Sequence, residues 1–215
     1  MAFWSGVVDV LREAIFAYAQ MSHGNLAYGI MAVTFLARLA LLPLTLRLAR
    51  SAAVQQEAMH RLKPELDAAR VTLKDDPAGL AKEIQRIYAR EGLSMIPAVG
   101  CAGVLLQAPI LLALYNAVRK CAETGGRFLW IRDLSKPDVA LALLVGAVTA
   151  ASMATGPQPD APAQQRLLMV ALPAVFTVIA LWQMASGVGL YWGVSSLVGV
   201  AQGLIVRRSL AQRAS

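Results

Sequence analysis

Long apolar runs alternate with polar segments along most of this 215-residue chain. Five of the runs contain no acidic residue and approach or exceed the length that a helix needs to cross a bilayer, about 20 residues. They are Gly29–Leu46, Met95–Val118, Val139–Ala154, Leu167–Gln183 and Ser186–Val206. The third run is short for a span. Almost nothing separates the last two, which predicts a tight helical hairpin at Ala185–Gly187. We therefore expect an all-α, polytopic membrane protein with five transmembrane helices.

One long hydrophilic segment, residues 47–92, separates the first two runs. Its apolar residues recur at helical spacing in two sets, one on each side of a break. They are Leu62, Leu66, Ala69 and Leu73 in the first set, and Ile84, Ile87 and Tyr88 in the second. At the break, Asp76 suits the N-cap of a new helix and Pro77 suits its first position. The segment predicts an antiparallel helical hairpin that projects from the membrane.

Residues 1–28 predict an amphipathic helix. Its apolar side chains recur at helical spacing, and its charged residues lie near the opposite side. They are Phe3, Trp4, Val7, Val8, Leu11, Ile15 and Tyr18 on the apolar side, and Asp9, Arg12 and Glu13 on the charged side. We expect this helix to lie in the membrane interface. Packing of the helix against the bundle is an equally good alternative.

Composition and charge add a topology to this pattern. Hydrophobic residues make up 57% of the chain and charged residues only 15%, against about 25% charged in soluble domains. Thirteen Lys and Arg residues lie on the side of the hairpin and the C-terminus, and six lie on the other. The positive-inside rule then predicts that the N-terminus lies outside and that the hairpin and the C-terminus lie in the cytoplasm.

The expected division of the chain follows. It is an outer amphipathic helix (1–28), transmembrane helix 1 (29–46), the cytoplasmic hairpin (47–92), transmembrane helix 2 (93–118), an outer loop (119–138), transmembrane helix 3 (139–154), a cytoplasmic loop (155–166), transmembrane helices 4 (167–185) and 5 (186–206), and a cytoplasmic tail (207–215).

Arg38 lies in the middle of the first run, far from either end. A charged side chain there costs roughly 2.5–3.5 kcal/mol on insertion scales and marks a functional site by default. No run supplies an acidic partner, so we expect Arg38 to face a wet cavity lined by hydroxyl and amide groups. The candidates are Thr34, Gln107, Gln183, Ser195, Ser196 and Gln202. The alternative is that Arg38 caps carbonyl groups or pairs with a lipid phosphate.

Other features point to packing or exclude classes of function. The last run carries the pairs Gly189/Gly193 and Gly199/Gly203, a spacing typical of closely packed membrane helices. The sequence contains no metal-ligand cluster, nucleotide motif or intramembrane acid–base pair, so we expect neither an enzyme nor a metal or other cofactor. The two cysteines, Cys101 and Cys121, are too far apart along a helix for a disulfide.

Five collinear segments resemble the YidC-type membrane protein insertase family and its oxidase-assembly relatives. They are Thr34–Leu46, Leu62–Gly92, Gly100–Arg119, Phe128–Asp138 and Leu172–Leu197. The chain departs from the family pattern at Ile96, at Arg132 and in the turn between Trp182 and Gly187.

The resemblance implies a membrane insertase and chaperone that draws the polar tail of a nascent membrane protein into a positively charged groove and releases its apolar segment into lipid. It carries groove roles onto Arg38, Thr34, Gln107, Tyr191, Trp192 and Ser196, and substrate or ribosome contacts onto Leu62, Pro64, Asp76, Pro77 and Tyr88. Implied partners are nascent membrane proteins and the lipid bilayer. The ribosome, targeting factors and the general secretion channel are further candidates, and no nucleic-acid specificity is implied. A dedicated assembly factor without insertase activity, or a small transporter or channel subunit, stays open as an alternative.

Overall fold

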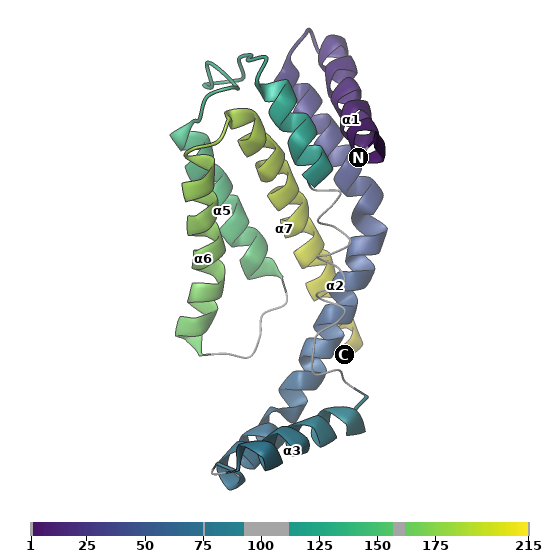
Figure 1. Ribbon diagram of the computed structural model, residues 1–215, viewed down its shortest axis with the longest axis vertical. Coiled ribbons are helices and arrows are strands. Elements are labelled where there is room, and N and C mark those ends of the chain that lie inside the picture. Colours follow the sequence, from purple (N-terminus) through teal and green to yellow (C-terminus); the bar gives the residue numbers. More distant parts are fainter. Residues whose placement is uncertain (1, 75, 93–111, 157–161, 215) are drawn as a thin grey trace.

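The computed structural model describes residues 2–74, 76–92, 112–156 and 162–214, and these residues are largely helical (Figure 1). The labelled helices are α1 (Ala2–Met21), α2 (Leu26–Thr72), α3 (Pro77–Arg90), α5 (Val139–Thr155), α6 (Ala163–Leu181) and α7 (Ser186–Ala214). Residues 112–122 form a further helix. The second predicted span lies within the described residues only from residue 112 onward.

Two predicted boundaries between a membrane span and a polar segment fall inside continuous helices. The first span and the first arm of the hairpin belong to one continuous helix, α2, of 47 residues, which contains both Pro43 and Pro64. The predicted tail 207–215 is also not separate, because α7 continues as a helix to Ala214. In both places the chain becomes polar while the helix continues, and polarity by itself does not end a helix.

The helices have two ends in common. We call the end that carries residues 22–25, 123–138 and 182–185 the loop end, and the end that carries residues 47–92 the hairpin end (Figure 1). Helices α2, α5 and α7 all run from the loop end toward the hairpin end, and α6 runs back. The tight connection between α6 and α7 occupies residues 182–185, so these helices form the predicted hairpin, but its turn precedes the predicted Ala185–Gly187 because Ser186 already begins α7.

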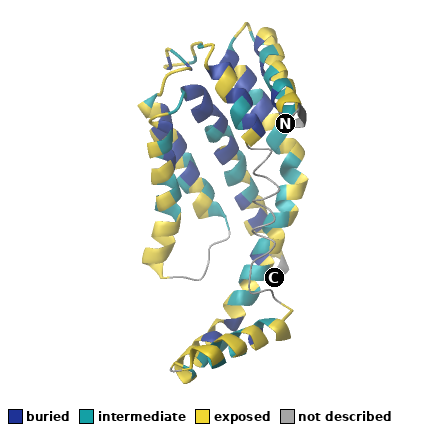
Figure 2. Cartoon of the chain, in the orientation of Figure 1, coloured by how far each residue is buried: buried dark blue, intermediate teal, exposed yellow. Residues whose placement is uncertain are grey.

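Most of the apolar surface faces outward. The helices α2, α6 and the Ser186–Ser209 part of α7 are long and apolar enough to cross a membrane, and α5 is apolar but shorter. Only 11% of the apolar window of α6 is buried within the protein. Figure 2 shows buried residues gathered along α7 and the loop-end part of α2, while α3 and α6 are mostly exposed. An exposed apolar surface of this kind requires lipid around it, as expected for a helical membrane protein.

The N-terminal helix packs on α2. Val8, Ile15 and Ala19 of α1 are buried in the main core. Gly29 permits the approach, because any Cβ at that position would collide with the carbonyl oxygen of Ile15. The reversal between the helices uses positive φ at His23 (56°) and Gly24 (75°). The alternative in which α1 packs against the bundle is therefore confirmed for its contact with α2. The position of α1 in the membrane interface stays a prediction.

The loop end is tied down by backbone hydrogen bonds. The backbone N–H of Ser186 donates to the carbonyl of Lys136 (2.9 Å), and that of Gly187 donates to Leu134 (3.1 Å). Leu134 is fully buried, and the ring of Phe128 meets Tyr28 edge to face with centroids 5.4 Å apart. These contacts join the loop 123–138 to the starts of α2 and α7.

Candidate functional site

Arg38 lies on α2, and its guanidinium reaches the neighbouring helix α7. Its Nε donates a hydrogen bond to the hydroxyl oxygen of Ser195 at 3.1 Å. The side chain is half-buried. Ser195, one of the predicted polar partners, is itself buried in the interface. The interaction fixes the cation between two apolar helices without neutralising its charge.

A cavity of about 620 Å³ surrounds this pair. Every apolar helix of the bundle contributes to its wall: α2, the helix 112–122, α5, α6 and α7. The lining residues are Arg38, Leu112, Tyr115, Thr149, Ser152, Met153, Pro173, Phe176, Thr177, Tyr191, Trp192, Ser195, Ser196 and Gly199. None of these described residues is acidic, so the positive charge of Arg38 dominates the potential in the cavity.

The hydroxyl groups of the wall are held in place. The hydroxyls of Thr149 on α5 and Ser196 on α7 hydrogen-bond to each other at 3.1 Å. The hydroxyl of Thr177 donates to the carbonyl of Pro173 one turn earlier in α6, at 2.8 Å. Pro173 lies inside α6 and has no backbone N–H. The bond from Thr177 therefore forms next to a gap in the hydrogen bonding of the helix backbone.

Glycines of α7 set its distance from α5. A Cβ at Gly189 would stand 2.7 Å from Leu141, and one at Gly203 would stand 2.9 Å from the backbone of Thr155. Gly193 and Gly199 similarly face Val145 and Ser152. The predicted packing seam is therefore confirmed. Close approach of the two backbones brings Thr149 and Ser196 within hydrogen-bonding distance.

The cavity gathers four of the six residues to which the sequence assigned groove roles. Arg38, Tyr191, Trp192 and Ser196 all line it. Gln107 lies outside the described residues. Thr34 is a correction: it is fully buried, its hydroxyl donates to the carbonyl of Ile30 at 2.6 Å, and it is absent from the wall.

Two other predicted partners of Arg38 are also elsewhere. Gln183 is exposed in the turn at the loop end, and Gln202 lines a different, apolar cavity between α2 and α7. Sequence reasoning missed Thr149, Ser152 and Thr177, which face the cavity from α5 and α6. The available signal was the presence of hydroxyl residues within otherwise apolar spans.

The hairpin has a small core of its own. Leu62 and Leu66 of α2 and Ile87 of α3 are buried together, with Ala69, Ile84 and Tyr88 packed against them. This matches the two predicted apolar sets. Asp76 caps α3 as predicted, because its carboxylate accepts a hydrogen bond from the backbone N–H of Gly79 at 2.9 Å.

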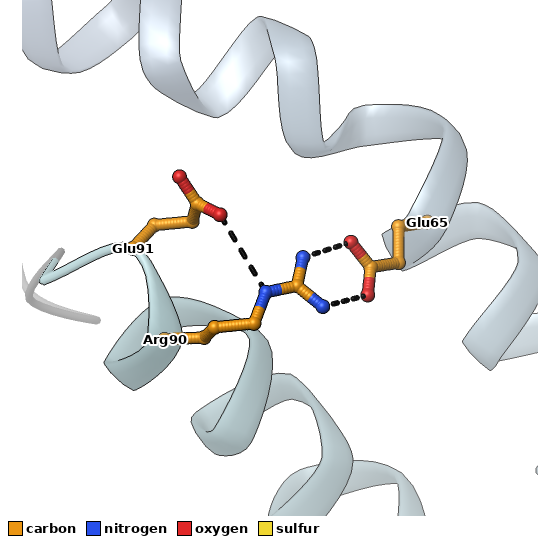
Figure 3. A network of polar contacts seen from close by, with 3 residues as sticks. All are labelled: Glu65, Arg90 and Glu91. Atoms are coloured by element: carbon orange, nitrogen blue, oxygen red, sulfur yellow. Dashed lines mark hydrogen bonds and ion pairs between the residues drawn. The ribbon is translucent and has the colours of Figure 1, made fainter.

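An ion pair closes the hairpin on its exposed side. Both terminal nitrogens of Arg90 donate to the carboxylate of Glu65, at 2.9 and 2.6 Å, and Glu91 lies beside the guanidinium (Figure 3). The hydrogen bond from Arg90 lowers the pKa of Glu65, and the same bond raises the pKa of Arg90. A two-pronged pair of this kind fixes the orientation of α3 on α2.

The predicted contact residues of the hairpin differ in accessibility. Pro64, Asp76 and Pro77 are exposed, and Tyr88 is partly buried. Leu62 is a correction, because only 7% of its surface is accessible and its side chain packs against α3. A partner could touch Leu62 only after the hairpin opens.

A family model described as "60Kd inner membrane protein" matches residues 17–213. A protein of Aliivibrio salmonicida (strain LFI1238) named "Membrane protein insertase YidC" is 33% identical over 98% of this chain and 38% of its own length. "Membrane protein insertase YidC" of a Vibrio cholerae serotype O1 strain is 34% identical over 88% of this chain and 35% of its own length. The chain thus spans little more than a third of these two relatives.

A shorter relative matches along most of its length. "Membrane protein insertase YidC 2" of Listeria monocytogenes serotype 4b (strain F2365) is 30% identical over 96% of this chain and 77% of its own length. A solved structure, described as an active YidC insertase crystal structure with the first transmembrane domain resolved, superposes with a TM-score of 0.59 at 26% identity, covering 93% of this chain and 45% of that one. The chain therefore belongs to the 60Kd inner membrane protein family of YidC-type membrane protein insertases.

Proposed function

We propose that this protein is a membrane insertase and chaperone whose cavity around Arg38 receives the polar tail of a nascent membrane protein. The observation that carries the proposal is an arginine without an acidic partner in a largely apolar cavity that also carries several hydroxyl groups and is walled by α2, the helix 112–122, α5, α6 and α7. Its volume of about 620 Å³ corresponds to on the order of twenty waters at their liquid density. That is room for a short hydrated peptide segment.

Electrostatics gives the cavity a preference for acidic tails. A carboxylate about 4 Å from a guanidinium gains roughly 4 kcal/mol at the effective dielectric of partly exposed sites, before its own desolvation is subtracted. Serine and threonine hydroxyls on α5 and α7 supply further hydrogen bonds to the tail. A tail held there has a shorter apolar distance left to cross.

The apolar segment of the substrate would leave across α6. This helix exposes Leu172, Phe176 and Ile179 at helical spacing, each more than half accessible. Burial of apolar surface in lipid supplies the driving force, at about 25 cal/mol per Å². No nucleotide is required in this scheme.

The orientation and partners extend the same proposal. The excess of Lys and Arg at the hairpin end supports a cytoplasmic hairpin and C-terminus in a multi-pass inner-membrane protein. The exposed Pro64, Asp76 and Pro77 would then be available to the ribosome, to targeting factors or to an emerging substrate. The general secretion channel is a further candidate partner within the bilayer.

The test is insertion into liposomes that contain only this purified protein. The substrate is a short single-span protein with an acidic translocated tail, and insertion is scored by protease protection. We expect protection above that of empty liposomes, a large loss with Arg38→Ala, and partial retention with Arg38→Lys. A matched substrate with Asp and Glu of its tail changed to Asn and Gln should depend much less on Arg38.

Two outcomes would count against this function. Equal insertion by wild type and Arg38→Ala of every acidic-tailed substrate would refute the role of the charge. No protection at all with folded wild-type protein would favour the dedicated assembly factor.

A further inference from the structure

A tight turn at the loop end displays two apolar side chains away from the protein. Phe128 and Ile131 form an isolated antiparallel bridge, with backbone hydrogen bonds of 2.9 and 2.8 Å in the two directions. Leu129 and Trp130 make the two-residue connection between them. Leu129 is 74% exposed and Trp130 is 50% exposed.

The backbone at the tip is strained. Leu129 has φ of +49°, a left-handed conformation that bulky side chains rarely adopt and that glycine or asparagine adopts far more easily. A leucine at this position is unfavourable twice in water, through its backbone and through its exposed side chain. Burial of the leucine side chain in an apolar environment would remove the second cost and offset the first.

The base of the turn is packed against the core and hydrogen-bonded to α5. Ile131 and Leu134 are buried in the core, and Phe128 packs edge to face on Tyr28 of α2. The indole nitrogen of Trp130 donates to the carboxylate of Asp138 at 3.2 Å. Asp138 is also the N-cap of α5, where it accepts from the N–H of Leu141 at 2.7 Å. The tip is thus coupled directly to the first turn of α5.

Two cations flank the apolar tip. Arg127 and Arg132 are both exposed. Within the described residues, neither guanidinium forms an ion pair or a hydrogen bond. Apolar and aromatic side chains beside lysine or arginine are the usual composition of segments that sit at the boundary between headgroups and acyl chains.

We propose that the turn Phe128–Ile131 is a lipid anchor: Leu129 and Trp130 enter the headgroup–acyl boundary of the leaflet at the loop end, and Arg127 and Arg132 bind lipid phosphates. The anchor goes beyond the insertase function and does not depend on it. Its position fits α5, whose 17 residues span only about 25 Å at 1.5 Å per residue, less than the roughly 30 Å of a bilayer core. Anchoring the turn that caps α5 fixes where this short helix meets the leaflet.

The first experiment measures the depth of Trp130. Trp4, Trp182 and Trp192 are changed to Phe, so that Trp130 is the only tryptophan of the full-length protein. The protein is reconstituted into vesicles of phosphatidylcholine and phosphatidylglycerol, with or without lipids brominated near the headgroup. We expect strong quenching of Trp130. The matched control carries its single tryptophan at Ser135, an exposed polar position of the same loop (Ser135→Trp with Trp130→Phe), and should be quenched several-fold less.

The second variant separates anchoring from folding. Leu129→Asn tolerates the left-handed backbone but removes the apolar side chain, so in detergent its thermal midpoint should equal or exceed that of the parent. In vesicles its Trp130 quenching should fall several-fold. Trp130 of the parent should be quenched more strongly in vesicles that contain phosphatidylglycerol than in vesicles of phosphatidylcholine alone. Changing Arg127 and Arg132 to Gln should remove this difference.

Three results would overturn the proposal. One is quenching of Trp130 no greater than that of the Ser135→Trp reporter, which would instead favour a protein partner for the tip. Another is unchanged quenching in Leu129→Asn. The third is a lower detergent midpoint of Leu129→Asn, because it would show that Leu129 serves the protein core.

Discussion

Truncation of Ile87 should release α3 from the hairpin while the rest of the protein stays folded. Ile87 is 2% exposed and packs on Leu62 and Leu66, which together make up the buried core of the hairpin. Ile→Ala in a buried site costs about 2–5 kcal/mol. A core of three residues can relax around the cavity, so the lower end, about 2 kcal/mol, applies here.

This free energy sets the size of the effect. Isolated helices shorter than about 12–15 residues are marginal in water, and α3 has 14 residues. Its helical amides are therefore protected from exchange mainly while it is docked on α2. A loss of about 2 kcal/mol corresponds to roughly a 30-fold increase in the undocked fraction, since each 1.4 kcal/mol is tenfold.

Hydrogen exchange with mass spectrometry on the full-length protein in detergent or nanodiscs measures this directly. Peptides covering Pro77–Arg90 should exchange about 30-fold faster in Ile87→Ala, whereas peptides from α5 and α7 should not change. Gln85→Ala is the matched control, because Gln85 is exposed on the same helix and alanine preserves helix propensity. Equal exchange of α3 in Ile87→Ala and wild type would refute the docking argument, and so would a comparable effect of Gln85→Ala.

Three further predictions concern other contacts. Gly29→Ala should lower the free energy of unfolding by about 1–3 kcal/mol through overpacking, because the new Cβ collides with the carbonyl of Ile15. The thermal midpoint in detergent should fall accordingly, and an unchanged midpoint would show that α1 does not need this close approach. Asp76→Ala should cost α3 about 0.5–2 kcal/mol, with Asp76→Asn largely retaining the cap, and exchange at Gly79 reports it. The hydrogen bond from Arg90 lowers the pKa of Glu65, so this pair stabilises the hairpin above the ordinary glutamate pKa and the stabilisation is lost as pH falls below about 4. Protection of α3, corrected for intrinsic exchange, should fall in that window in wild type, and Glu65→Gln should flatten this part of the profile.

The sequence predicted local structure well wherever one periodic pattern decided it. The apolar stripes of the hairpin, the cap at Asp76 and the glycine seam of α7 all depend on residues three or four apart on one helix. Such spacings fix which side chains share a face whatever the tertiary structure. Residues 46 and 206, the predicted ends of two membrane spans, lie inside continuous helices, because the change there is in polarity alone.

The cavity was predicted only in part because its wall depends on side-chain reach and on helix rotation. Thr34 precedes Arg38 by one turn on the same face, yet its short side chain ends against its own helix at the Ile30 carbonyl. Arg38 is long enough to reach Ser195 on α7. Thr149 and Ser152 face the same cavity, which no spacing within α5 reveals. Contacts between helices of this kind require the relative rotation of both helices.

The choice of hydroxyls over carboxylates around Arg38 decides what the cavity can do. A buried carboxylate would cancel the positive potential and leave little attraction for an acidic tail. Ser195 instead accepts from Nε, one of the five N–H donors of the guanidinium. Its hydroxyl orients the cation while the net charge remains. The α5–α7 seam fixes most of the hydroxyl groups of the wall, while α6, which also lines the cavity, exposes Leu172, Phe176 and Ile179. The polar and apolar parts of a substrate therefore meet different surfaces. This asymmetry, together with the charge, gives the proposed insertion its direction from cavity to lipid.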